Sequence, residues 1–318
     1  MNSFYMEAYN GIKVSIVLEG NGMMDKDFKE VRKVLWLILF INLIVATGKI
    51  AVGTIINSTS MTADGLHSLS DGLSNIVGLI GVWLASKPID KCHPYGHGKF
   101  ETLAGLFISL MLFGIGTKIV IEGISRMIKP VMPDVTFQSL MILLITLFIN
   151  IFISIFEYLK GKKLNSQILI SDSMHTRSDI YISTGVLFTI LGIRLGLPAV
   201  IDSIVSFIVA GLVFKGAYSI FKYNRDVLID RAAVEEEEIK DIVLSFDKVR
   251  DIHKIRSRGS TKTLYVDMHI LTEPDLTVEK SHQLVHRIED KIRDHLNENV
   301  QLIVHLEPFY NSKGQKTL

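Results

Sequence analysis

The sequence predicts an α-helical membrane protein with six transmembrane helices and a small α+β domain at its C-terminal end. Long apolar stretches fill the chain from residue 34 to residue 223, and a charged, regularly alternating pattern follows them. Apolar residues make up 48% of the 318 residues and charged residues only 21%, with a mean hydropathy of +0.34. So large an apolar fraction requires a lipid environment or an unusually large core.

Charge and cysteine content exclude several classes of protein. The net charge is +1, which gives no reason to expect a nucleic-acid partner. Cys92 is the single cysteine, so neither a disulfide framework nor a cysteine-based zinc finger can form.

Six stretches have the roughly 20 apolar residues that a membrane-spanning helix needs. They lie in a predicted transmembrane domain, residues 34–223, which follows an N-terminal cytoplasmic leader, residues 1–33. We predict spans at 34–56, 60–86, 100–125, 135–159, 172–194 and 198–221. Thirteen Lys and Arg residues flank the spans on the side of the termini and three on the other side. The positive-inside rule therefore predicts a multi-pass protein of the cell membrane with both termini in the cytoplasm.

Residues 224–308 are predicted to form a cytoplasmic domain, and residues 309–318 a polar tail. Helical patterns cover about 235–246 and 277–296, and strand patterns cover 251–258, 264–271 and 300–304. The order α-β-β-α-β favours a small ferredoxin-like α+β domain.

A repeated motif, D-x-x-H-x-x-x-D, occurs in the second and fifth predicted spans. Its His and final Asp are one helical turn apart, so they share one face. Two such helices facing each other present four ligands suited to a divalent transition metal, above all zinc. The predicted ligands are His67, Asp71, His175 and Asp179.

The alternative for this motif is a set of polar contacts that holds the helices together. Ionisable groups at membrane depth cost about 2.5–3.5 kcal/mol each on insertion scales, and this cost favours a functional site. The outer acids, Asp64 and Asp172, are interpreted as hydrogen-bonding partners of the neighbouring imidazoles or as helix caps.

Two further groups of possible ligands lie outside the predicted spans. In the loop after the second span, Asp90, His93 and His97 have a spacing that suits zinc; the alternative is a solvated loop. In the cytoplasmic domain we expect four of six residues to bind metal, namely His253, His269, His282, His286, His305 and Glu307, and we expect His295 to be inert. Surface histidines without a function are the alternative.

The motifs at His67–Asp71 (H-S-L-S-D), His93–Lys99 (H-P-Y-G-H-G-K) and His175–Asp179 (H-T-R-S-D) resemble those of the cation diffusion facilitator family. The resemblance covers about residues 30–308. It implies a homodimer in the lipid bilayer that exports Zn²⁺, or in some branches Mn²⁺, Fe²⁺, Co²⁺, Ni²⁺ or Cd²⁺, from the cytoplasm in exchange for protons. The metal would be both substrate and regulatory ligand.

The resemblance also implies three metal sites and one salt bridge. The transport and loop sites fall on the residues named above. The regulatory cytoplasmic site falls on His253, His269, His282, His305 and Glu307, and a salt bridge at the dimer falls on Lys99 and Asp230. His67 departs from the Asp that some bacterial members carry, Glu307 departs from the frequent Asp, and the loop after the fourth span has no histidines.

Two other functions fit a helical membrane protein with possible metal ligands, an intramembrane metalloprotease and a metal-gated channel. An intramembrane metalloprotease needs H-E-x-x-H and an open ligand position, and the chain lacks that motif. A metal-gated channel would pass metal steadily without a requirement for protons. The expected function is therefore transport, with no enzymatic activity.

Overall fold

The computed structural model describes the backbone of residues 2–55, 59–128, 137–195, 198, 200–260, 262–296 and 299–310. Within these ranges it leaves undescribed the side chains of residues 2–26, 52–53, 59–67, 70–71, 138–139, 190–191, 193–194 and 202. The chain forms two compact units, Met1–Asn224 and Arg225–Leu318.

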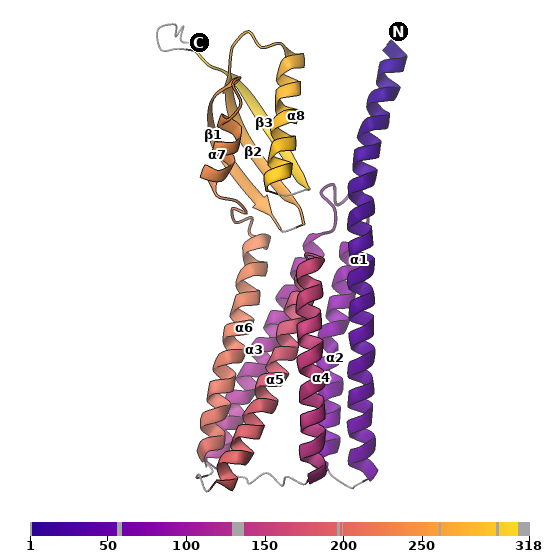
Figure 1. Ribbon diagram of the computed structural model, residues 1–318, viewed down its shortest axis with the longest axis vertical. Helices are drawn as coiled ribbons and strands as arrows, with labels where there is room; N and C mark the ends of the chain where they lie inside the picture. Colours follow the sequence, from indigo (N-terminus) through magenta and orange to yellow (C-terminus); the bar gives the residue numbers. More distant parts are fainter. Residues whose placement is uncertain are drawn as a thin grey trace. The chain divides into compact units, whose positions relative to one another are not determined.

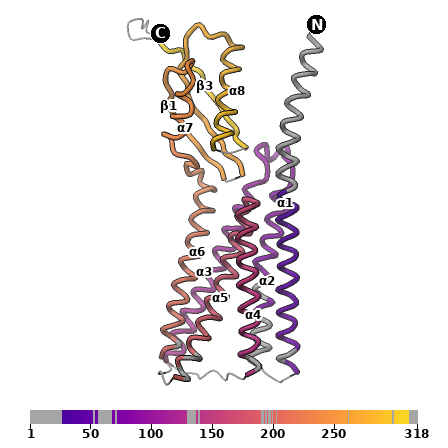
Figure 2. Tube along the Cα trace, in the orientation of Figure 1, coloured from indigo at the N-terminus to yellow at the C-terminus, as the bar shows by residue number. Residues whose placement is uncertain are grey.

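Helices make up the first unit, and they run alongside one another (Figure 1). In chain order they are α1 (Asn2–Ile55), α2 (Thr59–Ala85), α3 (Lys99–Ile128), α4 (Phe137–Lys163), α5 (Gln167–Arg194) and α6 (Val200–Leu228). Figure 2 follows the same path, in which α2 lies beside α1, α3 and α5. Each of the six predicted spans overlaps one of these helices, and the spans 100–125 and 172–194 lie entirely within α3 and α5.

Four helical segments in the described part of the chain are long and apolar enough to cross a membrane. They are Asp27–Ala51, Lys99–Ile128, Leu140–Lys163 and Ser203–Leu228, and Gly72–Ala85 is a shorter apolar helix. Large apolar side chains such as Phe148 and Phe152 on α4 are about 70% exposed, as expected for a surface that contacts lipid. The predicted class, a helical membrane protein with a C-terminal α+β domain, is confirmed.

Close helix packing in this unit depends on small residues. A Cβ atom at Gly81 of α2 would lie 2.4 Å from the Cβ of Ala104 on α3. Leu35, Ile168 and Leu169, from α1 and α5, are completely buried in the same core. This packing holds the N-terminal half of α5 against α2.

The second unit has the predicted order of elements. It contains α7 (Glu236–Leu244), β1 (Val249–Gly259), β2 (Leu264–Thr272), α8 (Val278–His295) and β3 (Val300–Pro308). The sheet order is β1-β2-β3, with β1 antiparallel and β3 parallel to β2. Helix α8 begins where the Thr277 side chain accepts a hydrogen bond from the backbone N–H of Lys280.

The two faces of this sheet have different roles. The core of the unit joins β2 to both helices through Val266, Met268 and Ile270 of β2 and the buried apolar residues of α7 and α8. Because side chains alternate along a strand, His269 lies on the other face, which neither helix covers. Strand register places His253 opposite His269, and His269 opposite His305. Three histidines therefore form one row across the sheet.

Candidate metal sites

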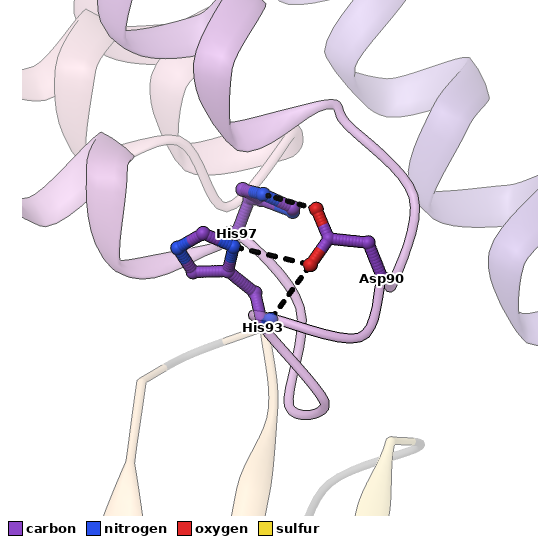
Figure 3. Close-up of side chains that lie close together, drawn as sticks. All are labelled: Asp90, His93 and His97. Carbon is purple, nitrogen blue, oxygen red and sulfur yellow. Dashed lines mark hydrogen bonds and ion pairs between the residues drawn. The ribbon is translucent and has the colours of Figure 1, made fainter.

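The loop between α2 and α3 brings Asp90, His93 and His97 together. The Asp90 carboxylate lies 3.2 Å from Nδ1 of His93 and 3.4 Å from Nε2 of His97, and both imidazoles turn toward it (Figure 3). One ligand atom from each of the three residues falls within 4.8 Å of the others. A carboxylate and two imidazoles at this spacing suit a divalent transition metal.

Hydrogen bonds between the Asp90 side chain and backbone N–H groups hold this loop in shape. Oδ1 of Asp90 accepts the backbone N–H groups of Cys92 (2.8 Å) and His93 (2.7 Å). Together with the His93 side chain, these bonds hold the pKa of Asp90 below its ordinary value, and the His93 backbone contributes most. Gly96 adopts a φ of +87°, which favours glycine. His97 is buried and stacks on Phe100 at 6.0 Å.

Within the helical unit, α5 presents a buried polar face that includes His175. The His175 imidazole is only 3% exposed, and neither ring nitrogen has a hydrogen-bond partner among the described residues. Burying an unpaired polar group costs about 1–3 kcal/mol, so a ligand or a neighbouring polar side chain is expected at this imidazole. Asp179, one helical turn further on, is half-buried.

A network of buried polar groups lies beside His175 and joins four helices. Asn42 of α1 donates to Asn75 of α2 at 3.1 Å, and Asn75 donates to Asp172 of α5. The carboxyl group of Asp172 also lies next to that of Glu157 on α4, and Thr176 donates to Glu157 at 3.1 Å. Two adjacent carboxyl groups can share a hydrogen bond only when one of them carries a proton. The network can therefore hold a proton next to His175.

Glu157 is the functional candidate that sequence reasoning missed. It is completely buried within α4, three residues beyond Ser154, whose hydroxyl donates a hydrogen bond to the backbone carbonyl of Ser173 on α5. An ionisable residue inside an apolar span is itself a signal of function, and that signal was available in the sequence. The sequence does not reveal that Glu157 contacts residues of α5, because only packing places α4 against α5.

The expected role of Asp172 differs in the structure. It lies inside α5 rather than at the start of the helix, and it accepts a hydrogen bond from Asn75 instead of one from the His175 ring. On α2, Asp64, His67 and Asp71 lie in the helix, but their side chains are outside the described part. How these side chains face His175 and Asp179 stays a prediction.

In the second unit, the row of histidines converges on one carboxylate. Glu307 lies 2.7 Å from Nδ1 of His269 and 3.5 Å from Nε2 of His253. Ligand atoms of these three residues fall within 4.8 Å of one another. His305 is adjacent, with its Nε2 3.8 Å from Glu307 and its ring 4.6 Å from that of His269. The hydrogen bond from His269 is the main cause that lowers the pKa of Glu307.

His282 lies elsewhere in this unit. It is exposed on α8, where its Nε2 faces Nε2 of His286 at 3.1 Å, and within one chain the domain core separates α8 from the row of histidines. A second protomer would be needed to bring His282 to that row. His295 binds the backbone carbonyl of Lys291 at 2.8 Å.

The predicted salt bridge between Lys99 and Asp230 involves both units. Lys99 is the first residue of α3, whereas Asp230 follows α6 and lies 3.7 Å from Arg258 in its own unit. The pairing of Lys99 with Asp230 stays a prediction.

The first unit has helices that can span a membrane and that enclose buried His and Asp side chains. The second unit carries a cluster of His and Glu side chains. Together these features define a class of membrane transporters for metal cations. Residues 35–229 match the family model described as the cation efflux transmembrane domain, and residues 232–309 match the cytoplasmic domain of cation efflux proteins, a dimerisation domain. The chain belongs to the cation diffusion facilitator family.

Named relatives cover most of this chain. An uncharacterised transporter, MJ0449 of Methanocaldococcus jannaschii, is 33% identical over 270 residues, which are 83% of this chain and 94% of the relative. The manganese efflux system protein MneP of Bacillus subtilis is 30% identical over 88% of this chain and 96% of the relative. The cation-efflux pump FieF of Shewanella oneidensis is 24% identical over 79% and 85%.

These matches establish the general function. The protein is a multi-pass membrane protein that exports divalent metal cations, and it dimerises. The family and these relatives are transporters, so the expectation that the chain is not an enzyme is confirmed.

Proposed function

We propose that this protein exports Zn²⁺ from the cytoplasm in exchange for protons, and that His67, Asp71, His175 and Asp179 hold the ion during transport. The observation that carries the proposal is the buried His175 imidazole on α5, whose ring nitrogens have no partner in the described part of the chain. Two imidazoles and two carboxylates make a four-ligand set that suits zinc.

Proton exchange follows from the chemistry of the ligands. Imidazole binds metal only when it is neutral, so protons and metal compete for the site. The reference pKa of histidine is about 6.5, so its charge changes near neutral pH. The carboxyl pair of Glu157 and Asp172 provides a second place for a proton beside the site. Protons arriving from the far side would then expel the metal.

We assign the remaining predicted features to the same cycle. The termini and the cytoplasmic domain lie inside the cell, and the leader, transmembrane domain, cytoplasmic domain and tail span 1–33, 34–223, 224–308 and 309–318. Asp90, His93 and His97 would form a cytoplasmic loop site. His253, His269, His305 and Glu307 would hold a regulatory ion, with His282 from a second chain, and Lys99 and Asp230 would join the protomers of a homodimer.

Mn²⁺ is the second candidate substrate. It is favoured by the relative named as a manganese efflux protein, which is 30% identical over 88% of this chain. The His/Asp donors favour zinc instead, because imidazole is a poorer ligand for Mn²⁺ than for later divalent metals. Fe²⁺, Co²⁺ and Cd²⁺ use the same donors and belong in the same test.

Uptake into proteoliposomes separates these alternatives. Each metal is supplied outside vesicles with an acidic lumen, and metal uptake and lumenal pH are recorded together. We expect Zn²⁺ uptake accompanied by alkalinisation of the lumen, and loss of the imposed gradient should slow it. Equal uptake with and without the gradient would favour the metal-gated channel, and faster uptake of Mn²⁺ than of Zn²⁺ would reassign the substrate.

A further inference from the structure

We propose that Lys49 of α1 is a fixed positive charge at the transport site, which competes with the metal for the carboxylates and so promotes release of the ion. Its Nζ donates a hydrogen bond to the hydroxyl of Ser68 on α2 at 2.9 Å. Ser68 directly follows His67 and lies three residues before Asp71. This role rests on the proposed function, because it requires the metal to bind at His67 and Asp71.

The hydrogen bond to Ser68 brings Lys49 to the side of α2 that carries the predicted ligands. At about 3.6 residues per turn, one arc of about 100° around this helix holds Ser68, both predicted ligands and one further acid. These four residues are Asp64, His67, Ser68 and Asp71. The ammonium group therefore lies over the most acidic part of α2.

A second contact between α1 and α2 has the same register. Asn42 of α1 donates to Asn75 of α2 at 3.1 Å. Lys49 lies seven residues after Asn42, and Ser68 lies seven residues before Asn75, so the two contacts are about two helical turns apart on both helices. Asp71 lies between them along α2. The position of Lys49 is therefore part of the regular pairing of the two helices.

The alternative for a lysine near the end of a spanning helix is a side chain that extends toward water. Lys49 belongs to the apolar segment Asp27–Ala51 and lies six residues before α1 ends at Ile55. Ser68 lies nine residues after α2 begins at Thr59. At about 1.5 Å per residue, these positions are about 9 Å and about 14 Å from the helix ends. The Lys49 side chain therefore points away from the nearby helix end and deeper into the unit.

The charge of the site explains what this ammonium group does. Zn²⁺ held by two carboxylates and two neutral imidazoles is electrically neutral, so Lys49 gives the metal-bound site a net positive charge. Without metal, Lys49 offsets part of the charge of the same two carboxylates. It therefore stabilises the metal-free site and opposes the bound ion by repulsion. Transport requires this balance, because an ion that binds must also leave.

Zinc binding to the full-length protein tests the role of Lys49. Purified dimer is titrated with Zn²⁺ against a chelator of known affinity at about pH 8, where the imidazoles are neutral. The ion that Asp179→Ala fails to bind identifies the transport site. We expect Lys49→Met to bind that ion about 10-fold more tightly, because the repulsion is removed. Lys49→Arg keeps the charge and should bind it as wild type does. In proteoliposomes, Lys49→Met should lower both KM and kcat for zinc.

Further variants separate charge from helix packing. Lys49→Gln can still donate to Ser68 but is neutral, so it should bind zinc as tightly as Lys49→Met does. The matched control is Lys118→Met, which removes a lysine beside Glu122 on α3 and should leave the zinc affinity unchanged.

Unchanged or weaker zinc binding in both neutral variants of Lys49 overturns the proposal, and a lower thermal stability with unchanged affinity would assign Lys49 to helix packing. If Asp179→Ala binds as many ions as wild type, the proposed transport site is wrong, and the role of Lys49 at that site is refuted with it. The two failures are distinguishable, because only the second changes the result for Asp179→Ala.

Discussion

His269 and Glu307 come from neighbouring strands, and their side chains meet with Nδ1 2.7 Å from Oε1. Strand pairing places His269 opposite His305, two residues before Glu307, so all three side chains share one face of the sheet. This contact is the centre of the histidine row, and it sets the charge state of the carboxylate.

The first prediction concerns the pH response of that contact in metal-free protein. The pKa of Glu307 is lowered, chiefly by the hydrogen bond from His269. A carboxylate with a lowered pKa stabilises the fold above its ordinary value of 4.5, and this contribution is lost as pH falls through the lower native value. His269→Ala should move the titration of Glu307 upward, toward 4.5. NMR of the carboxyl carbons in protein labelled at Glu measures the titration of Glu307. The same titration midpoint in wild type and His269→Ala would contradict His269 as the cause of the lowered pKa.

The second prediction concerns the transport site. Asp71→Ala and Asp179→Ala should each abolish metal transport in proteoliposomes, because each removes a charged ligand from a four-ligand set. Expression and dimerisation should persist. Asp275→Ala, which removes an exposed carboxylate from the cytoplasmic unit, is the control and should transport normally. Wild-type rates in both site variants would place the site elsewhere.

The third prediction concerns metal selectivity. His67→Asp replaces an imidazole with a carboxylate, which favours harder ions such as Mn²⁺. The ratio of Mn²⁺ to Zn²⁺ uptake should therefore rise. The same ratio in wild type and variant would count against His67 as a direct ligand.

The fourth prediction concerns the buried carboxyl pair. Glu157→Gln keeps a hydrogen-bonding side chain for Thr176 and Asp172 but cannot exchange a proton. It should fold and dimerise, with transport reduced because the pair loses its exchangeable proton. We expect a reduction of about 10- to 100-fold, the size of effect that follows the loss of a group beyond the direct ligands of a metal. The matched control is Glu122→Gln on α3, where the side chain is half exposed beside Lys118. A wild-type rate and pH profile for Glu157→Gln would exclude Glu157 from the cycle.

The fifth prediction separates structure from metal binding in the loop. Asp90→Asn retains an oxygen that accepts the N–H groups of Cys92 and His93, but it removes the charge. It should keep the loop intact and bind Zn²⁺ more weakly. Asp90→Ala removes the turn as well and should also increase proteolysis of the loop. Equal zinc affinity in wild type and Asp90→Asn would exclude a metal site there.

Much of the fold follows from local patterns in the sequence. Six apolar stretches are enough to predict the helices α1–α6, because hydropathy and span length are properties of each segment alone. Alternation in residues 264–271 and the helical period in residues 277–296 predict β2 and α8 for the same reason. The motif repeat places His175 and Asp179 on one helical face without any tertiary information.

Only the tertiary structure decided how these pieces meet. The partnership of Glu157 with Asp172 depends on α4 packing against α5, and no local pattern encodes which helices are neighbours. The row from His253 to His305 requires a register across two strand pairs, one antiparallel and one parallel. The separation of His282 from that row depends on which face of the sheet α8 covers. Spacing along the chain determines which residues share a helix or strand face, whereas contacts between faces arise from packing of segments that are distant in sequence.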